Sequence, residues 1–88
     1  MTLSSGQLIG LKVKTQSGLA LGRIKDFEVE AETGQIIRYV VADGGWLPKL
    51  LNQDLLVDKS QIVRITEEEM IVEDGLVGNK DMVEEAAV

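Results

Sequence analysis

The side chains that could do chemistry in this sequence are carboxylates, hydroxyls and amines. The 88-residue chain has fifteen Asp and Glu residues and nine Lys and Arg residues, but no His and no Cys. Thiol nucleophiles, Ser-His-acid triads, imidazole bases and zinc sites built from Cys or His are therefore excluded. We accordingly expect no catalytic residues, no cofactor and no enzymatic activity.

The densest run of carboxylates is Glu67-Glu68-Glu69. Three adjacent like charges repel one another and their side chains diverge, so the run favours a solvated turn over a metal site. The other acidic stretches lack the alternating spacing and the mid-loop glycine of a calcium loop. We predict no metal site, and an oxygen-ligand site for calcium or magnesium stays open only as a third alternative.

The basic residues are unevenly distributed along the chain. Residues 1–25 carry a charge of +4 and no acid, whereas residues 26–88 carry −10, within a formal net charge of −6. If the first two strands pair, the four bases form one candidate basic patch, made of Lys12, Lys14, Arg23 and Lys25. The alternative without a function is that these bases form surface ion pairs with nearby acids such as Asp26 and Glu28. Each such pair stabilises a fold by about 0–1 kcal/mol. The acidic total argues against general nucleic-acid binding.

One stretch, residues 18–45, organises the rest of the chain. Its apolar residues alternate and are rich in β-branched and aromatic types, which predicts a long β-hairpin with its turn at 31–34. Gly34 can close that turn in the left-handed conformation. The apolar parity changes midway along the first arm, which requires a bulge, and we place it at Lys25 and Asp26. Both faces of the second arm are apolar, so we expect it to be a central strand.

Four further strands complete the predicted fold. They are expected at residues 8–14, with Ile9, Leu11 and Val13 pointing inward, and at 54–58, 62–65 and 70–73. Six short strands without a confident helix are typical of a small all-β antiparallel sandwich or barrel. We predict one domain over residues 1–74 and a C-terminal tail over 75–88 that is frayed or forms a short helix.

The loop between the hairpin and the next strand holds the chain's single tryptophan and single proline. Its apolar residues, Trp46, Leu47, Leu50 and Leu51, either cap one end of the barrel or form a protein-docking patch. An open sheet of this size leaves two exposed edges, so either the barrel closes or its edges meet a second copy, as in a homodimer.

No apolar run approaches the roughly 20 residues needed to span a bilayer. The first residues have neither the basic patch nor the apolar core of a signal peptide. We therefore expect a cytoplasmic protein that does not insert into a membrane.

Several of these residues form an ordered pattern that resembles the PRC-barrel domain. The matching positions are Leu8-Ile9-Gly10-x-x-Val13, Gly18-x-x-Leu21-Gly22-x-Ile24-x-Asp26-Phe27-x-Val29, Thr33-Gly34-Gln35-Ile36 and Tyr39-Val40-Val41. The later Ile62-Val63-x-Ile65 and Met70-Ile71-Val72 fall where the family has its closing strands. The resemblance implies a six-stranded β-barrel in which Gly10, Gly22, Asp26 and Gly34 form the fold, and it supplies no catalytic residue.

The family includes the cytoplasmic domain of the photosynthetic reaction centre H subunit and the C-terminal domain of a ribosome maturation factor. Its common theme is contact with other macromolecules. The resemblance thus implies a stand-alone, non-enzymatic adaptor that binds another protein through a sheet edge or the 46–51 loop. Peripheral association with a membrane complex stays open. Two alternatives are an accessory factor in RNA processing or ribosome assembly that uses the basic first hairpin, and binding of a metal ion or a small apolar ligand.

Overall fold

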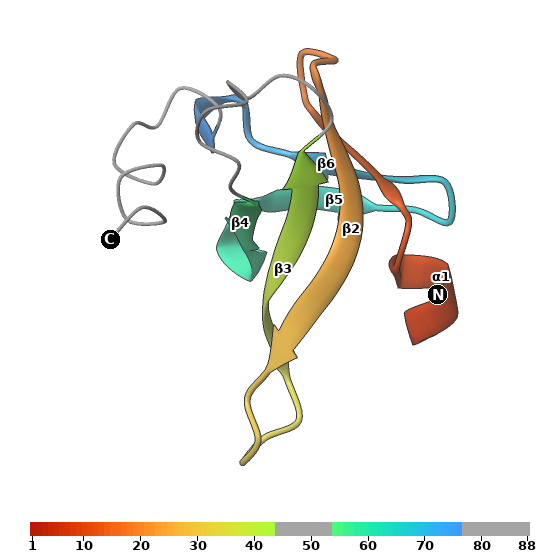
Figure 1. Ribbon diagram of the computed structural model, residues 1–88, viewed down its shortest axis with the longest axis vertical. Helices are drawn as coiled ribbons and strands as arrows, with labels where there is room; N and C mark the ends of the chain where they lie inside the picture. The colour runs from red at the N-terminus through yellow and green to blue at the C-terminus, as the bar shows by residue number, and fades with distance from the viewer. Residues whose placement is uncertain (44–53, 77–88) are drawn as a thin grey trace.

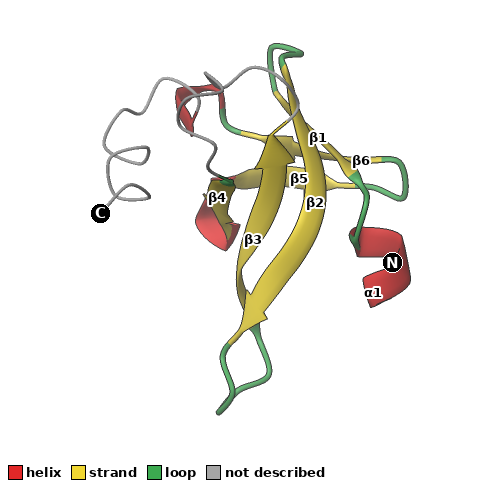
Figure 2. Cartoon of the chain, in the orientation of Figure 1, coloured by secondary structure: helices red, strands yellow, loops and turns green. Residues whose placement is uncertain are grey.

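A computed structural model describes residues 1–43 and 54–76 of the chain (Figure 1). These residues form six strands and three short helical segments that are joined by loops and turns (Figure 2). In chain order they are α1 (Ser5–Leu8), β1 (Lys12–Thr15), β2 (Ala20–Val29), β3 (Ile36–Asp43), β4 (Leu55–Asp58), η1 (Lys59–Gln61), β5 (Ile62–Ile65), β6 (Glu69–Val72) and η2 (Asp74–Leu76). None of the helices in the described parts of the chain has the length and apolar character to cross a membrane.

The six strands form one sheet in the order β4-β3-β2-β1-β6-β5. The predicted all-antiparallel pairing is wrong at one place, because β1 and β6 run parallel. In Figure 1 the long strands β2 and β3 run vertically while β5 and β6 run across the view, so the sheet coils strongly between its two ends.

Closure of the barrel by strand pairing, which the sequence analysis expected, is not observed among the described residues. The two edge strands, β4 and β5, do not pair with each other. They are nevertheless consecutive in the chain, and the three residues of η1 advance it by only about 6 Å. The ends of the sheet therefore approach each other at η1. Asp58 and Gln61 form a reciprocal capping box around η1, and this directs the chain from one edge strand into the other.

The β2–β3 hairpin is confirmed. Its turn is closed by backbone bonds from Glu30 to Gln35 and from Gly34 to Glu30, and Gly34 has a φ of 78°. The pairing of β2 with β3 skips one residue between Ile24 and Asp26, which is the predicted bulge. β3 lies between β2 and β4, as expected of a strand with two apolar faces.

The core lies on one face of the coiled sheet. Every strand except the edge strand β5 contributes fully or nearly fully buried side chains, and Leu8 of α1 joins them. The largest of those that are fully buried are Leu21, Ile24, Met70, Val13, Val41, Val57 and Val72. Burying side chains of this size stabilises a fold by roughly 1.5–3 kcal/mol each.

The predicted strand over residues 8–14 is wrong in its first half. Ser4 and Gln7 form a capping box that starts the short helix α1, and Gly10 turns the chain with a φ of 94°. As a result Leu8 is buried and Ile9 is 42% exposed, whereas Leu11 and Val13 point into the core as expected. The strands predicted at 54–58, 62–65 and 70–73 are each found within one residue of those bounds.

Candidate functional site

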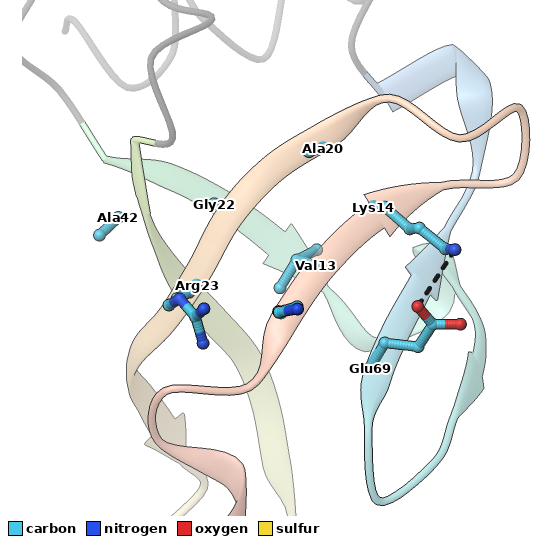
Figure 3. Close-up of a pocket in the computed structure, with 8 residues that line it drawn as sticks. Val13, Lys14, Ala20, Gly22, Arg23, Ala42 and Glu69 are labelled. Atoms are coloured by element: carbon cyan, nitrogen blue, oxygen red, sulfur yellow. Dashed lines mark ion pairs between the residues drawn. The ribbon is translucent and has the colours of Figure 1, made fainter.

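Three of the four predicted basic residues line one open hollow on the sheet. Lys12 and Lys14 lie on β1, where they alternate with the buried Val13 and Thr15, and Arg23 lies opposite Lys12 on β2. Figure 3 shows Arg23 near one end of the hollow and Lys14 near the other. The backbone pairing of the first hairpin brings the three cations together, as the sequence analysis expected.

The hollow exists because small residues lie between the basic ones. Ala20 and Gly22 of β2 and Ala42 of β3 line it and project little or no side chain from the sheet. The space has a volume of about 640 Å³, within the roughly 300–1,000 Å³ of typical ligand sites. It is open to solvent along the sheet, so it is accessible to an extended partner.

Two contacts position the charged side chains around the hollow. Lys14 Nζ lies 3.1 Å from Glu69 Oε1, and Arg23 Nη1 donates a hydrogen bond of 2.9 Å to the backbone oxygen of Gly10. The bond to Gly10 uses one of the five N–H donors of the guanidinium. The lining holds three cations and one carboxylate, so its net charge is +2. The site is therefore suited to an anionic group.

Lys25 does not line this hollow. Its Nζ pairs with Asp54 Oδ2 at 2.7 Å. The acids named as partners in the sequence analysis are used differently, because Glu28 pairs with Arg38 at 2.9 Å and Asp26 accepts a hydrogen bond from the N–H of Phe27.

Glu69 is the site residue that the sequence analysis missed. It belongs to the acidic run, in which Glu67 and Glu68 are exposed as expected of a solvated turn. Glu69 instead begins β6, and the parallel pairing of β6 with β1 brings it to Lys14. No local spacing signals a contact between residues so far apart in the chain.

The motif glycines adopt backbone conformations that favour glycine. Gly10, Gly22 and Gly34 all have a positive φ, and Gly22 also lines the hollow. A side chain at Gly22 would require a strained backbone. The glycine therefore serves both the course of β2 and the open space beside it.

Other candidate sites add little to this picture. Among residues 1–43 and 54–76, no three acidic side chains come together in a way that could hold a metal ion. A second hollow of about 380 Å³ adjoins the first and shares Lys14 and Glu69 with it. The candidate docking residues, Trp46, Leu47, Leu50 and Leu51, lie outside the described residues, as does most of the predicted tail.

The coiled six-stranded sheet and its open basic hollow define a small all-β domain with a surface suited to binding. The sequence profile of the PRC-barrel domain matches residues 2–76, so the chain belongs to the PRC-barrel family. This confirms the resemblance noted from the sequence motifs, and the family is one of non-catalytic domains. No curated protein matches the chain closely enough to be counted as a relative.

Proposed function

We propose that this chain is a non-enzymatic adaptor domain that binds other proteins and forms a homodimer through the edge strand β5. The observation that carries the proposal is the unpaired edge itself. Within the described residues β5 has β6 as its one strand neighbour, so one side of its backbone is available for pairing. Unpaired edges readily add another strand.

The side chains of β5 suit such pairing. Val63 is 49% exposed, so its apolar surface is partly open to solvent, and the neighbouring Arg64 is also exposed. β5 has no proline and no inward-pointing charge of the kind that protects strand edges, although a bulge interrupts its pairing with β6 between Ile62 and Arg64. A second β-strand would cover Val63.

The charges that flank β5 favour an antiparallel partner of the same sequence. Lys59 lies just before β5, and the exposed Glu67 and Glu68 lie just after it. If two copies of β5 pair about a twofold axis between Val63 and Arg64, the start of β5 in each copy lies beside the end of β5 in the other, which brings Lys59 of η1 toward the Glu67-Glu68 turn of the partner copy. A twofold pairing uses the same patch on both copies, so the complementary contact forms twice.

The proposed dimer is small, because β5 has only four residues. Interfaces of this kind are at the low end of the size range, and we expect a dissociation constant of about micromolar order. Light scattering after size-exclusion chromatography, over a wide range of protein concentration, measures it directly. We expect the mass to rise from monomer to dimer as the concentration increases.

The variant Val63→Lys tests the edge, because a lysine on an edge strand opposes pairing. Val29→Lys is the matched control, since Val29 has nearly the same exposure, 45%, but lies at the far end of β2. We expect Val63→Lys to stay monomeric and Val29→Lys to dimerise like the parent chain. A parent chain that is monomeric at every concentration overturns the homodimer. If the Val63→Lys variant still dimerises, the interface lies on another surface, such as the 46–51 loop.

A charge swap tests the orientation. Lys59→Glu should weaken the dimer, and the double variant Lys59→Glu with Glu68→Lys should restore it, because each copy then presents the reversed pair to the other. Restoration is expected only for antiparallel pairing of identical strands. Failure to restore excludes this register.

A further inference from the structure

We infer that the basic hollow on β1 and β2 binds an acidic peptide segment of a partner protein. This inference rests on the proposed function as a protein-interaction domain and names both the surface and the chemistry of the partner. The hollow is lined by β1, β2, β3 and Glu69 of β6, whereas the proposed dimer contact is the backbone edge of β5, so separate variants test the two contacts. Val63 and Arg64 of β5 share the second hollow with Lys14 and Glu69.

The charged side chains around the hollow lie in rows across neighbouring strands. The pairs Ala42–Arg23, Arg23–Lys12 and Lys12–Glu69 place four residues in one row across strands β3, β2, β1 and β6. Lys14 and Ala20 form a neighbouring pair. Since side chains on one face of adjacent strands lie about 5 Å apart, Lys12 and Arg23 can contact the same carboxylate or successive carboxylates of an extended chain.

Two of the three cations, Lys12 and Arg23, have no ion-pair partner within residues 1–43 and 54–76. Of the four charged groups around the hollow, one pair is joined, Lys14 with Glu69. Arg23 is fixed by a neutral carbonyl, that of Gly10, which holds the guanidinium without cancelling its charge. Planar guanidinium groups bind carboxylates through two parallel hydrogen bonds, so Arg23 is the anchor for an acidic side chain.

The charge of the hollow and of the whole chain favours a peptide over a nucleic acid as the ligand. Nucleic-acid binding depends on many phosphate contacts, whereas this hollow offers three cations beside one carboxylate. The whole chain has a net charge of −6, so an extended polyanion is repelled by most of the molecule. A short acidic segment spans little more than the hollow and gains the local attraction, and the small residues Ala20, Gly22 and Ala42 leave room for its backbone.

The test measures binding of fluorescein-labelled hexaglutamate by fluorescence anisotropy, with hexaglutamine as the uncharged control and decauridine as the nucleic-acid control. We expect the full chain to bind hexaglutamate and to bind it more weakly as salt is added. We expect no detectable binding of hexaglutamine. Absence of hexaglutamate binding at low ionic strength overturns the inference. Tighter binding of decauridine also overturns it and favours a nucleic-acid partner.

Variants assign the binding to the hollow. The double variant Lys12→Gln with Arg23→Gln should weaken hexaglutamate binding by about tenfold or more, because it removes two charge-assisted contacts. Lys25→Gln is the matched control, since it removes a cation from the same strand as Arg23 but outside the hollow, and it should change the affinity less than about twofold. An equal loss of hexaglutamate affinity in Lys25→Gln would show that binding depends on the total charge of the chain. That result overturns the assignment of binding to the hollow.

A second variant avoids removing the bond from Arg23 to Gly10. Ala20 is exposed and pairs with Lys14, so Ala20→Glu places a carboxylate inside the hollow with little effect on the core. It should reduce hexaglutamate binding as strongly as the double variant. The monomeric variant Val63→Lys should bind hexaglutamate at least as tightly as the parent chain, because Val63 lines the second hollow together with Lys14 and the added lysine brings a further cation near the site. Loss of dimerisation with intact peptide binding thus concerns only the β5 edge, whereas a dimer that fails to bind hexaglutamate overturns only the present inference.

Discussion

The backbone N–H of Ser17 donates a hydrogen bond of 2.8 Å to Oδ1 of Asp74, although the two residues are 57 positions apart. Ser17 lies in the turn between β1 and β2, and Asp74 begins η2 just after β6. The neighbouring backbone bond from Gln16 to Val72 joins the same two segments. This clasp fastens the end of β6 to the first hairpin, the hairpin that carries the basic hollow.

Removal of the Asp74 carboxylate should make the clasp weaker and change how stability depends on pH. Hydrogen bonds from Ser17 hold the pKa of Asp74 below its usual value of 3.8. The bonds favour the ionised form, so their stabilisation is present above the unfolded pKa and is lost as the pH falls through the lower folded pKa. The melting temperature of Asp74→Ala should therefore lie below that of the parent chain near neutral pH, and the difference should shrink in acid.

Thermal unfolding of both chains, followed by circular dichroism from neutral pH to about pH 2, measures this difference. Glu73→Ala is the control, because Glu73 is an exposed neighbour that contributes only its backbone to the sheet. A difference between Asp74→Ala and the parent that persists unchanged in acid would mean that the carboxylate acts through packing.

Tyr39 should titrate at a higher pH than a free tyrosine. The side chain is 6% exposed and its ring meets Phe27 edge-on at 6.4 Å, so burial raises the pKa of Tyr39 above its usual 10.0. The unfolded chain ionises first as the pH rises past about 10, which draws the equilibrium toward unfolding. The stability contributed by this group is complete below pH 10 and is lost above it.

Tyr39 is the chain's single tyrosine, so its ionisation can be followed without interference from another phenol. The tyrosinate absorbance of the native protein should have its midpoint above 10, and should rise together with alkaline unfolding. Tyr39→Phe should unfold at a higher pH than the parent chain, because it cannot ionise. Titration of the native protein at or below 10 would contradict the burial argument.

Local pattern was enough to predict the centre of this fold. The bulge in β2 follows from the change of apolar parity before Phe27, and Gly34 follows from the polar turn around it. Both features depend on residues close together in the chain. The parallel pairing of β1 with β6 does not, because the hairpin, β4 and β5 separate these two strands in the chain.

The same distinction applies to the candidate site. Lys12 and Arg23 were expected to be neighbours because consecutive strands usually pair. Lys14 pairs with Glu69, and Lys25 pairs with Asp54. Both acids lie far along the chain from their partners, and no local sequence pattern predicts these contacts. The small residues of the hollow, such as Ala42, carry no signal until the register of β3 against β2 is known.

The corrected N-terminus gives a prediction about two apolar residues on either side of Gly10. Leu11 is 6% exposed and Ile9 is 42% exposed, although alternation alone assigns both to the core. Leu11→Ala should destabilise the chain by about 2–4 kcal/mol through lost burial and the cavity left behind. Ile9→Ala should cost less than about 1 kcal/mol. Urea unfolding measures the free energy of unfolding of both variants. Equal losses of stability would support a continuous strand over residues 8–14 instead of the helix and turn.

Substitution of Gly34 should isolate the energy of backbone conformation from that of packing. A Cβ added at Gly34 would meet nothing within 4 Å, so Gly34→Ala creates no clash, but its φ of 78° is a conformation that L-residues rarely adopt. The expected loss is about 1–2 kcal/mol in the free energy of unfolding. Gly75→Ala is the matched control, because a Cβ there also meets nothing and Gly75 has no such φ, so it should be close to neutral. Gly34→Asn should recover part of the loss, since asparagine tolerates the left-handed region better than alanine. Equal stability of the two alanine variants in urea would show that the turn relaxes to another type and that β2 and β3 keep their register without it.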